Sequence, residues 1–263
     1  MSEKSCIRVA VSNQKGGVGK TTSTYNLAAA LAKTGKTVLM IDMDPQYSLT
    51  LSCAMMPDDP SYNGMSTCSL FSSSTDPLDC CFEVEPLAGK YKLFIVPSTQ
   101  ELAVTSKKLF TRTNSISVFK KKIDKLSEYF DYIFFDCPPS LDELLTSALV
   151  SSDEVIIPTR PEKLSMACLD LIIPTIRAVQ QAPSGQPGNK DLKIKGIIVT
   201  MYRSAIPEHK ENVEKLAESG YELLGIIPLS TIVSKDVGVG LPCTLAHPAS
   251  NPSKAYVNIA NSL

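Results

Sequence analysis

The stretch Asn13-Gln14-Lys15-Gly16-Gly17-Val18-Gly19-Lys20-Thr21-Thr22 decides the fold of this chain. An apolar run from Ile7 to Val11 precedes it and predicts a buried strand. An Ala- and Leu-rich run from Thr21 to Lys33 follows it and predicts a helix. A glycine-rich turn between a strand and a helix exposes backbone N–H groups beside the positive end of the helix dipole. We therefore expect residues 13–22 to bind phosphate groups.

Two side chains of this loop extend the prediction. Lys20 can reach the β- and γ-phosphates of a nucleotide, and the Thr21 hydroxyl can ligate Mg²⁺. The usual P-loop pattern is matched imperfectly, because Gln14 stands where the first glycine is expected. An additional lysine, Lys15, follows it.

Composition sets broad limits on the class of protein. The 263 residues fit one α/β domain spanning 1–263, and 43% of them are hydrophobic. The net charge of −1 indicates neither a nucleic-acid nor a membrane partner, so any basic surface has to be local. Eight cysteines without a C-x-x-C pair and two histidines give no zinc pattern, and we expect reduced thiols in a cytoplasmic protein. The polar N-terminus predicts no signal peptide, and no apolar run approaches the ~20 residues of a membrane-spanning helix.

Strand and helix patterns alternate along the chain, which predicts an α/β fold with a mostly parallel, twisted sheet and helices on both faces. The expected strands are Ile7–Ser12, Thr37–Ile41, Leu93–Val96, Tyr132–Phe135, Glu154–Ile157, Ile194–Thr200 and Leu223–Ile227. The expected helices are Lys20–Thr34, Thr99–Leu109, Ser117–Tyr129, Asp142–Val150, Ser165–Gln181, Pro207–Ser219 and Pro252–Ser262. Pro57–Pro86 is expected to be irregular or to form short helices on the surface, and Ala182–Asp191 to be a loop.

Acidic residues follow two of the expected strands. Asp42 and Asp44 come where a strand ends, and in open α/β sheets ligands bind at that edge. Their i, i+2 spacing makes them point the same way if the strand continues that far. We then expect Asp42 to support the phosphate-binding loop or the ligands around the metal ion. We expect Asp44 to orient an attacking water or to accept its proton. A strand end followed by a turn at Pro45 is the alternative interpretation.

A third acid, Asp136, ends the apolar run that begins at Tyr132. An acid at the end of a buried strand is typical of a Walker-B position, which holds Mg²⁺ through a water. Pro138-Pro139 predicts an extended loop that could sense the γ-phosphate. We interpret Cys137 as a space-filling residue rather than a reactive thiol.

These motifs together resemble the ParA/MinD group of deviant Walker-A ATPases within the P-loop NTPases. The match covers almost the whole chain and is closest to small ParA proteins without an N-terminal DNA-binding extension. The residues that carry it are Lys15–Thr22, Asp42–Gln46 and Asp136–Ser140, with supporting similarity at Val96–Ser98, Glu101–Ala103, Val199–Tyr202 and Ile227-Pro228.

The resemblance implies a mechanism that uses ATP and Mg²⁺. Two ATP-bound subunits would form a homodimer, with Lys15 of each subunit reaching the phosphates in the other, as an arginine finger does. Asp44 would position the attacking water, Thr21 and Asp136 would hold Mg²⁺, and Met201 and Pro228 would contact the adenine. Hydrolysis would be slow and would release the dimer. The residues implied to bind the nucleotide are Lys15, Gly16, Gly17, Val18, Gly19, Lys20, Thr21, Thr22, Met201 and Pro228.

Small ParA proteins also bind DNA without sequence preference, through arginines on the flank of the dimer. Leu229, Ile232 and Ala205 stand where the resemblance places arginines. Substitute basic clusters are Arg203 with Lys210, Lys235 and Lys254; Lys120-Lys121-Lys122; and Lys193 with Lys195. No basic residue follows Lys254, so we expect no MinD-type membrane anchor and predict that the last helix packs on the sheet through Tyr256, Ile259 and Ala260.

Three functions stay open. The first is partitioning of plasmid or chromosomal DNA with a ParB-like adaptor, and this DNA binding would place the protein on the nucleoid. The second is positioning of a protein cargo or polar assembly without DNA binding, which the absent arginines favour. The third is an ATP-dependent metabolic enzyme on the same scaffold, against which the Asp42–Gln46 motif argues.

Overall fold

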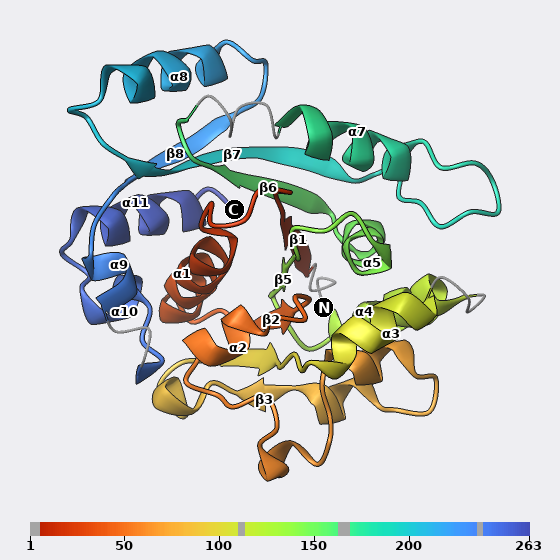
Figure 1. Cartoon of the computed structure of the whole chain (residues 1–263). Helices are drawn as coiled ribbons and strands as arrows, with labels where there is room; N and C mark the ends of the chain where they lie inside the picture. Colours follow the sequence, from red (N-terminus) through yellow and green to blue (C-terminus); the bar gives the residue numbers. More distant parts are fainter. Residues whose placement is uncertain (1–5, 110–113, 163–168, 236–238) are drawn as a thin grey trace, which may run out of the picture.

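The computed structural model describes residues 6–109, 114–162, 169–235 and 239–263, and these contain one eight-stranded sheet (Figure 1). The strand order is β3-β4-β2-β5-β1-β6-β7-β8, and all neighbours are parallel except β3 with β4. The strands are β1 (Ile7–Val11), β2 (Val38–Asp42), β3 (Phe82–Glu83), β4 (Leu93–Val96), β5 (Tyr132–Asp136), β6 (Glu154–Thr159), β7 (Lys193–Tyr202) and β8 (Leu223–Pro228). The predicted fold class is confirmed.

Helices cover both faces of the sheet. Figure 1 shows α1 and α11 on one side and α4 and α5 on the other. The helices are α1 (Lys20–Lys33), α2 (Ser48–Ser52), α3 (Glu101–Leu109), α4 (Ser115–Leu126), α5 (Glu143–Ser151), α7 (Leu169–Gln180), α8 (Pro207–Ala217), α9 (Ile232–Lys235), α10 (Cys243–Ala246) and α11 (Asn251–Ala260). Successive side chains of β1 enter opposite cores, because Val9 and Val11 pack with α1 while Ala10 packs with α5. Burial on both faces explains the continuous apolar strands.

The predicted strands agree with the observed ones to within two residues at each end. The sequence analysis missed β3, since a two-residue strand is too short to show alternation, and also the short helices α2, α9 and α10. The helix expected from Ser165 is observed from Leu169 to Gln180, and residues 165–168 lie outside the described part of the chain.

The segment from Pro57 to Pro86 forms short 3₁₀ helices, as expected, but its placement on the surface was wrong in part. The 3₁₀ helices are η1 (Pro60–Tyr62), η2 (Thr67–Phe71), η3 (Pro77–Cys80) and, at the end of the segment, η4 (Glu85–Leu87). Leu70 and Phe71 are buried, and the Phe71 ring stacks on Phe119 of α4 with 4.7 Å between centroids. The segment therefore contributes to the core on the α4 side of the sheet.

The last helix, α11, packs on the sheet as predicted. Tyr256, Ile259 and Ala260 are all buried. The Tyr256 hydroxyl lies 3.2 Å from the Ser23 hydroxyl of α1, which joins the two helices on this face. Among the described helices, none has the length and apolar character needed to cross a membrane.

The strand order brings the predicted site together. β5 lies between β2 and β1, so the loops that follow these three parallel strands leave the same edge of the sheet. Asp136 pairs in register with Val11 on one side and with Asp42 on the other. The phosphate-binding loop and the two acidic strand ends are therefore neighbours.

Candidate functional site

The loop between β1 and α1 has the backbone form that a phosphate cradle needs. Gly17 and Gly19 have φ values of +71° and +84°, a region that side chains with a Cβ rarely adopt. Gly19 precedes α1 without a side-chain cap, and the first turn of α1 holds no acid. The first amides of the helix are therefore left to an anion. The Thr200 hydroxyl of β7 donates to the Val18 carbonyl at 2.8 Å and fixes the loop to the sheet.

Lys20 is held inside this loop. Its side chain is buried, and its ammonium donates to the Lys15 carbonyl at 3.3 Å. Burial lowers the pKa of Lys20, while the nearby Asp136 carboxyl acts in the opposite direction. The lysine is thus placed among the loop amides, where a phosphate chain would supply its counter-charge.

Lys15 belongs to an ion-pair cluster on the other side of the loop. Its ammonium lies 3.2 Å from the Glu162 carboxylate, which also pairs with the Arg160 guanidinium at 2.6 Å. The Lys15 amide donates to the Asn13 side chain at 3.0 Å, and Asn13 in turn donates to the Pro158 carbonyl at 2.8 Å. In this structure Lys15 is therefore ion-paired with Glu162 of the same chain.

Thr21 and Asp136 meet as the sequence predicts. The Thr21 hydroxyl donates to one Asp136 oxygen at 2.6 Å, and the Thr24 hydroxyl donates to the other at 3.3 Å. Asp136 is fully buried, and burial, together with the neighbouring Asp42 carboxyl, raises its pKa to about 8. A buried carboxyl at a strand end, beside a hydroxyl, fits a hard cation such as Mg²⁺, which prefers oxygen ligands.

Asp42 and Asp44 have separate surroundings. β2 ends at Asp42, so the condition for the two side chains to point the same way is not met. Asp42 is fully buried and accepts hydrogen bonds from the amide and hydroxyl of Thr50 at 2.9 and 2.7 Å and from the Asp44 amide at 3.1 Å. Burial raises the pKa of Asp42 to about 7. Asp44 is partly exposed, and its carboxylate accepts from the Gln46 amide at 2.9 Å, while Ser98 donates to its backbone carbonyl at 2.8 Å.

A pocket with a volume of about 170 Å³ adjoins the loop. It contains both residues that the resemblance assigned to the base, Met201 and Pro228, and Met201 has the uncommon φ of +55°. The pocket also contains residues that the sequence analysis did not assign to it, among them Val233 and Tyr256. The lining is Gly19, Thr22, Thr200, Met201, Ile227, Pro228, Leu229, Ser230, Val233, Ser234 and Tyr256. A mainly apolar pocket that begins at Gly19 suits a flat aromatic base attached to phosphates in the loop.

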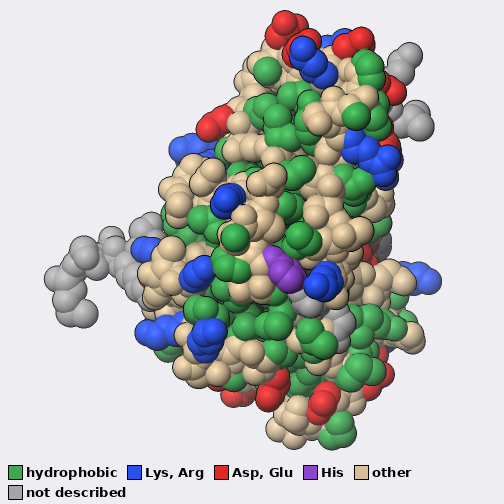
Figure 2. Space-filling model, turned by 90° about the vertical axis from the view of Figure 1, so that its left-hand side faces the viewer, with side chains coloured by type: hydrophobic (Ala, Val, Ile, Leu, Met, Phe, Trp, Pro, Cys, Tyr) green, Lys and Arg blue, Asp and Glu red, His purple; other side chains and the backbone are tan. Residues whose placement is uncertain are grey.

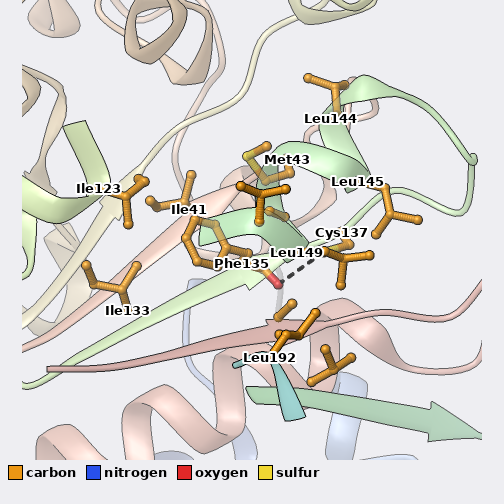
Figure 3. Close-up of a cluster of buried hydrophobic side chains, with 14 of the residues drawn as sticks. Ile41, Met43, Ile123, Ile133, Phe135, Cys137, Leu144, Leu145, Leu149 and Leu192 are labelled. Carbon is orange, nitrogen blue, oxygen red and sulfur yellow. Dashed lines mark hydrogen bonds between the residues drawn. The ribbon is translucent and has the colours of Figure 1, made fainter. Parts of the chain in front are cut away.

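Cys137, next to the Walker-B acid, fills space as expected. It is buried beside Leu145 and Leu149, and its thiol contacts the Phe135 carbonyl at 3.7 Å (Figure 3). Burial raises the pKa of the thiol, which disfavours the reactive thiolate.

The residues of the basic clusters proposed from the sequence differ in their surroundings. Figure 2 shows the side formed by α9, α10 and α11, where Lys and Arg side chains lie scattered among hydrophobic ones. Leu229 is 44% exposed, so an apolar side chain occupies one position expected for an arginine. Ala205 is exposed and Ile232 is partly buried. Two lysines of these clusters form ion pairs: Lys195 with Glu154 at 3.5 Å and Lys120 with Asp124 at 2.8 Å. The exposed basic residues of the clusters include Arg203, Lys210, Lys235, Lys254 and Lys193.

Comparisons with known proteins agree with this geometry. The family model described as "AAA domain" matches residues 7–194. The sporulation initiation inhibitor protein Soj of Bacillus subtilis is 30% identical over 97% of this chain and 97% of its own length. The chromosome partitioning protein ParA of Myxococcus xanthus is 30% identical over 97% of this chain and 87% of its own.

A solved structure extends the comparison to bound ligands. Cobyrinic acid a,c-diamide synthase from Mycobacterium smegmatis, with bound ADP and magnesium, superposes with a TM-score of 0.79 at 28% identity over 97% of this chain and 93% of that one. With its phosphate-binding loop, its Asp42 and Asp136 strand ends and these relatives, the chain belongs to the ParA/MinD family of deviant Walker-A ATPases.

Proposed function

We propose that this protein is an ATP-dependent switch that dimerises on ATP, hydrolyses it slowly and partitions plasmid or chromosomal DNA with a ParB-like partner. The observation that carries the proposal is the convergence of Lys20, the Thr21–Asp136 pair and the Met201–Pro228 pocket on one loop. This set offers a place for the phosphates, for a cation and for a base. A relative named as a chromosome partitioning protein supports the biological role.

Each residue of the site has a proposed task. The amides of residues 15–22 and the Lys20 ammonium bind the phosphates. Thr21 and Asp136 would hold Mg²⁺, which neutralises phosphate charge when it is bound. Asp42 holds the start of α2 through Thr50 and so positions the loop that carries Asp44. Asp44, the partly exposed carboxylate of this group, orients the attacking water.

Lys15 has a proposed task in the partner subunit, where it would neutralise the phosphates in trans. In the described chain it pairs with Glu162, so that pair has to break before Lys15 can reach across a dimer. Glu162 then acts against dimerisation, and ATP binding in the partner supplies the replacement counter-charge for Lys15.

Glu162→Gln is accordingly expected to favour the dimer. A partly exposed ion pair contributes up to about 1 kcal/mol, so the ATP concentration for half-maximal dimerisation should fall about two- to fivefold. Sedimentation velocity across an ATP series measures this shift. Glu128→Gln, which changes an exposed acid after α4, is the matched control and should leave the midpoint unchanged. A midpoint that rises in Glu162→Gln would contradict the proposed competition.

A second candidate function is the positioning of a protein cargo without DNA. The exposed Leu229, at a position where arginine was expected, favours it. An apolar side chain releases no counterions from DNA but can pack against protein.

The third candidate is an ATP-dependent enzyme that acts on a small molecule. The superposition on cobyrinic acid a,c-diamide synthase favours this candidate.

DNA binding by Asp44→Ala protein, in ATP and in ADP across a salt series, separates these functions. This substitution should leave nucleotide binding intact and accumulate the ATP dimer. For DNA partitioning we expect binding in ATP only. Its affinity should fall steeply as the salt concentration rises, because the release of counterions from DNA then gains less free energy. An ATP dimer that binds no DNA would reject partitioning through direct DNA contact and favour cargo positioning.

A further inference from the structure

A cleft with a volume of about 510 Å³ lies between α4 and the chain that joins η2 to η3. Figure 1 shows this chain directly beside α4, and the cleft shares no residue with the phosphate-binding loop. Its lining is Ser73, Ser74, Thr75, Asp76, Pro77, Val118, Lys121, Lys122 and Lys125. One wall thus contains three residues with hydroxyl side chains, Ser73, Ser74 and Thr75, and the other contains three lysines of α4.

The most buried lysine of this cleft, Lys122, forms no ion pair with a carboxylate within the part of the chain that the structure describes. Lys122 is 7% exposed, and its ammonium donates to the Thr75 carbonyl. A buried ammonium is stabilised far more by an anion than by a neutral carbonyl. Burial also lowers the pKa of Lys122, while the nearby Asp76 carboxylate acts in the opposite direction.

The other charges leave the cleft positive. Lys125 pairs with Asp76 at 2.7 Å. Just outside, Asp124 is already bound by Lys120 and Arg8, both at 2.8 Å. Lys121 is exposed and forms no ion pair within the described residues. Among the described residues, three lysines and one aspartate therefore line the cleft, so its lining carries two more positive than negative charges.

The hydroxyl wall can donate hydrogen bonds to an anion in the same place. Ser73 and Ser74 are exposed, and the hydroxyls of Ser72 and Ser74 lie 3.0 Å apart. A phosphomonoester carries close to two negative charges at neutral pH and three strong acceptor oxygens. Its charge equals the uncompensated charge of the lining, and its oxygens can accept from both ammonium and hydroxyl groups.

We infer that this cleft is a second anion site, which binds the phosphate group of a small phosphorylated molecule through Lys121, Lys122 and the Ser73–Thr75 hydroxyls. The concave shape favours a single phosphate group over the backbone of duplex DNA, which would need a row of contacts along a surface. Ligand binding here does not require the ATP-driven dimer.

The test uses the full chain carrying Lys20→Ala, so that the phosphate-binding loop lacks the lysine proposed to bind phosphates within the same chain. Isothermal titration with glycerol 2-phosphate, and separately with inorganic phosphate, should show saturable binding to one site. Adding Lys121→Ala, a surface change that leaves the buried Lys122 in place, should weaken binding at least tenfold, because a charge-assisted hydrogen bond is lost. Adding Ser74→Ala should weaken it by a smaller factor. Lys36→Ala, at an exposed position after α1, is the control and should change nothing.

The two probes distinguish the sources of the phosphate. Tighter binding of glycerol 2-phosphate supports a phosphorylated metabolite, and tighter binding of inorganic phosphate supports the free ion at the same site. Absence of saturable binding, or binding that Lys121→Ala leaves unchanged, would overturn the inference. A protein that binds neither phosphate probe but binds duplex DNA, and loses this DNA binding in Lys121→Ala, would also overturn the inference. The cleft would then be a nucleic-acid contact.

Discussion

Replacing Lys15 with alanine is expected to abolish ATP-dependent dimerisation and to lower the rate of ATP hydrolysis about 10³-fold or more. The proposed reason is that Lys15 supplies positive charge to the phosphates of the partner subunit, and a cation supplied in trans in this way contributes 10³–10⁵ to the rate. ATP binding to the single chain should persist, since Lys20 and the loop amides remain. Size-exclusion chromatography and a phosphate-release assay measure both effects.

The control for this prediction is Lys36→Ala, which removes an exposed lysine beyond the end of α1. It should dimerise and hydrolyse ATP as the unchanged protein does. An ATP dimer of normal stability in Lys15→Ala would show that Lys15 has no role in trans. Its pairing with Glu162 would then be only a structural contact within one chain.

Asp136→Asn is expected to abolish Mg²⁺-dependent hydrolysis and, at pH 8, to stabilise the metal-free protein. Asp136 and Asp42 are buried in register at adjacent strand ends, with pKa values raised to about 8 and about 7. In the unfolded chain an aspartate loses its proton near pH 4. Between pH 4 and 8 the folded state therefore holds more protons than the unfolded state, and the free energy of unfolding falls as pH rises.

Thermal unfolding at pH 5 and pH 8, in chelator, measures this dependence. The unchanged protein should melt several degrees lower at pH 8. Asp136→Asn should lose the part of that difference that comes from the Asp136 carboxyl and keep the part that comes from the burial of Asp42. Asp170→Asn, at an exposed site on α7, serves as the control and should keep the full dependence. Equal melting temperatures of the unchanged protein at the two pH values would contradict the burial of charge at these strand ends.

The sequence predicted the centre of the site because its signals are local. The order of residues from Lys15 to Thr22 defines the loop, and the apolar strand before Asp136 identifies the acid that the loop would face. The structure brings Thr21 and Asp136 to 2.6 Å because β1 and β5 are adjacent and parallel. A local pattern was sufficient here, since the order of the central strands follows from the fold class.

Contacts between distant segments were not predictable in the same way. Lys15 and Glu162 are 147 residues apart, and nothing in the residues around Glu162 indicates that it faces the loop. Tyr256 reaches the pocket because α11 packs on α1, and the apolar face of the last helix predicted only that it is buried. The shared direction of Asp42 and Asp44 was conditional on the strand continuing, and β2 ends at Asp42, two residues before Asp44, so alternation does not apply.

The most direct test of the ATP switch is sedimentation velocity of Asp44→Ala protein with Mg²⁺ and either ATP or ADP. Asp44 makes its described hydrogen bonds only within its own turn and to Ser98, so its truncation should leave the phosphate-binding loop intact. We predict a stable dimer in ATP and a monomer in ADP. A monomer in both nucleotides, with ATP demonstrably bound, would contradict an ATP-driven dimer and with it the proposed role of Lys15.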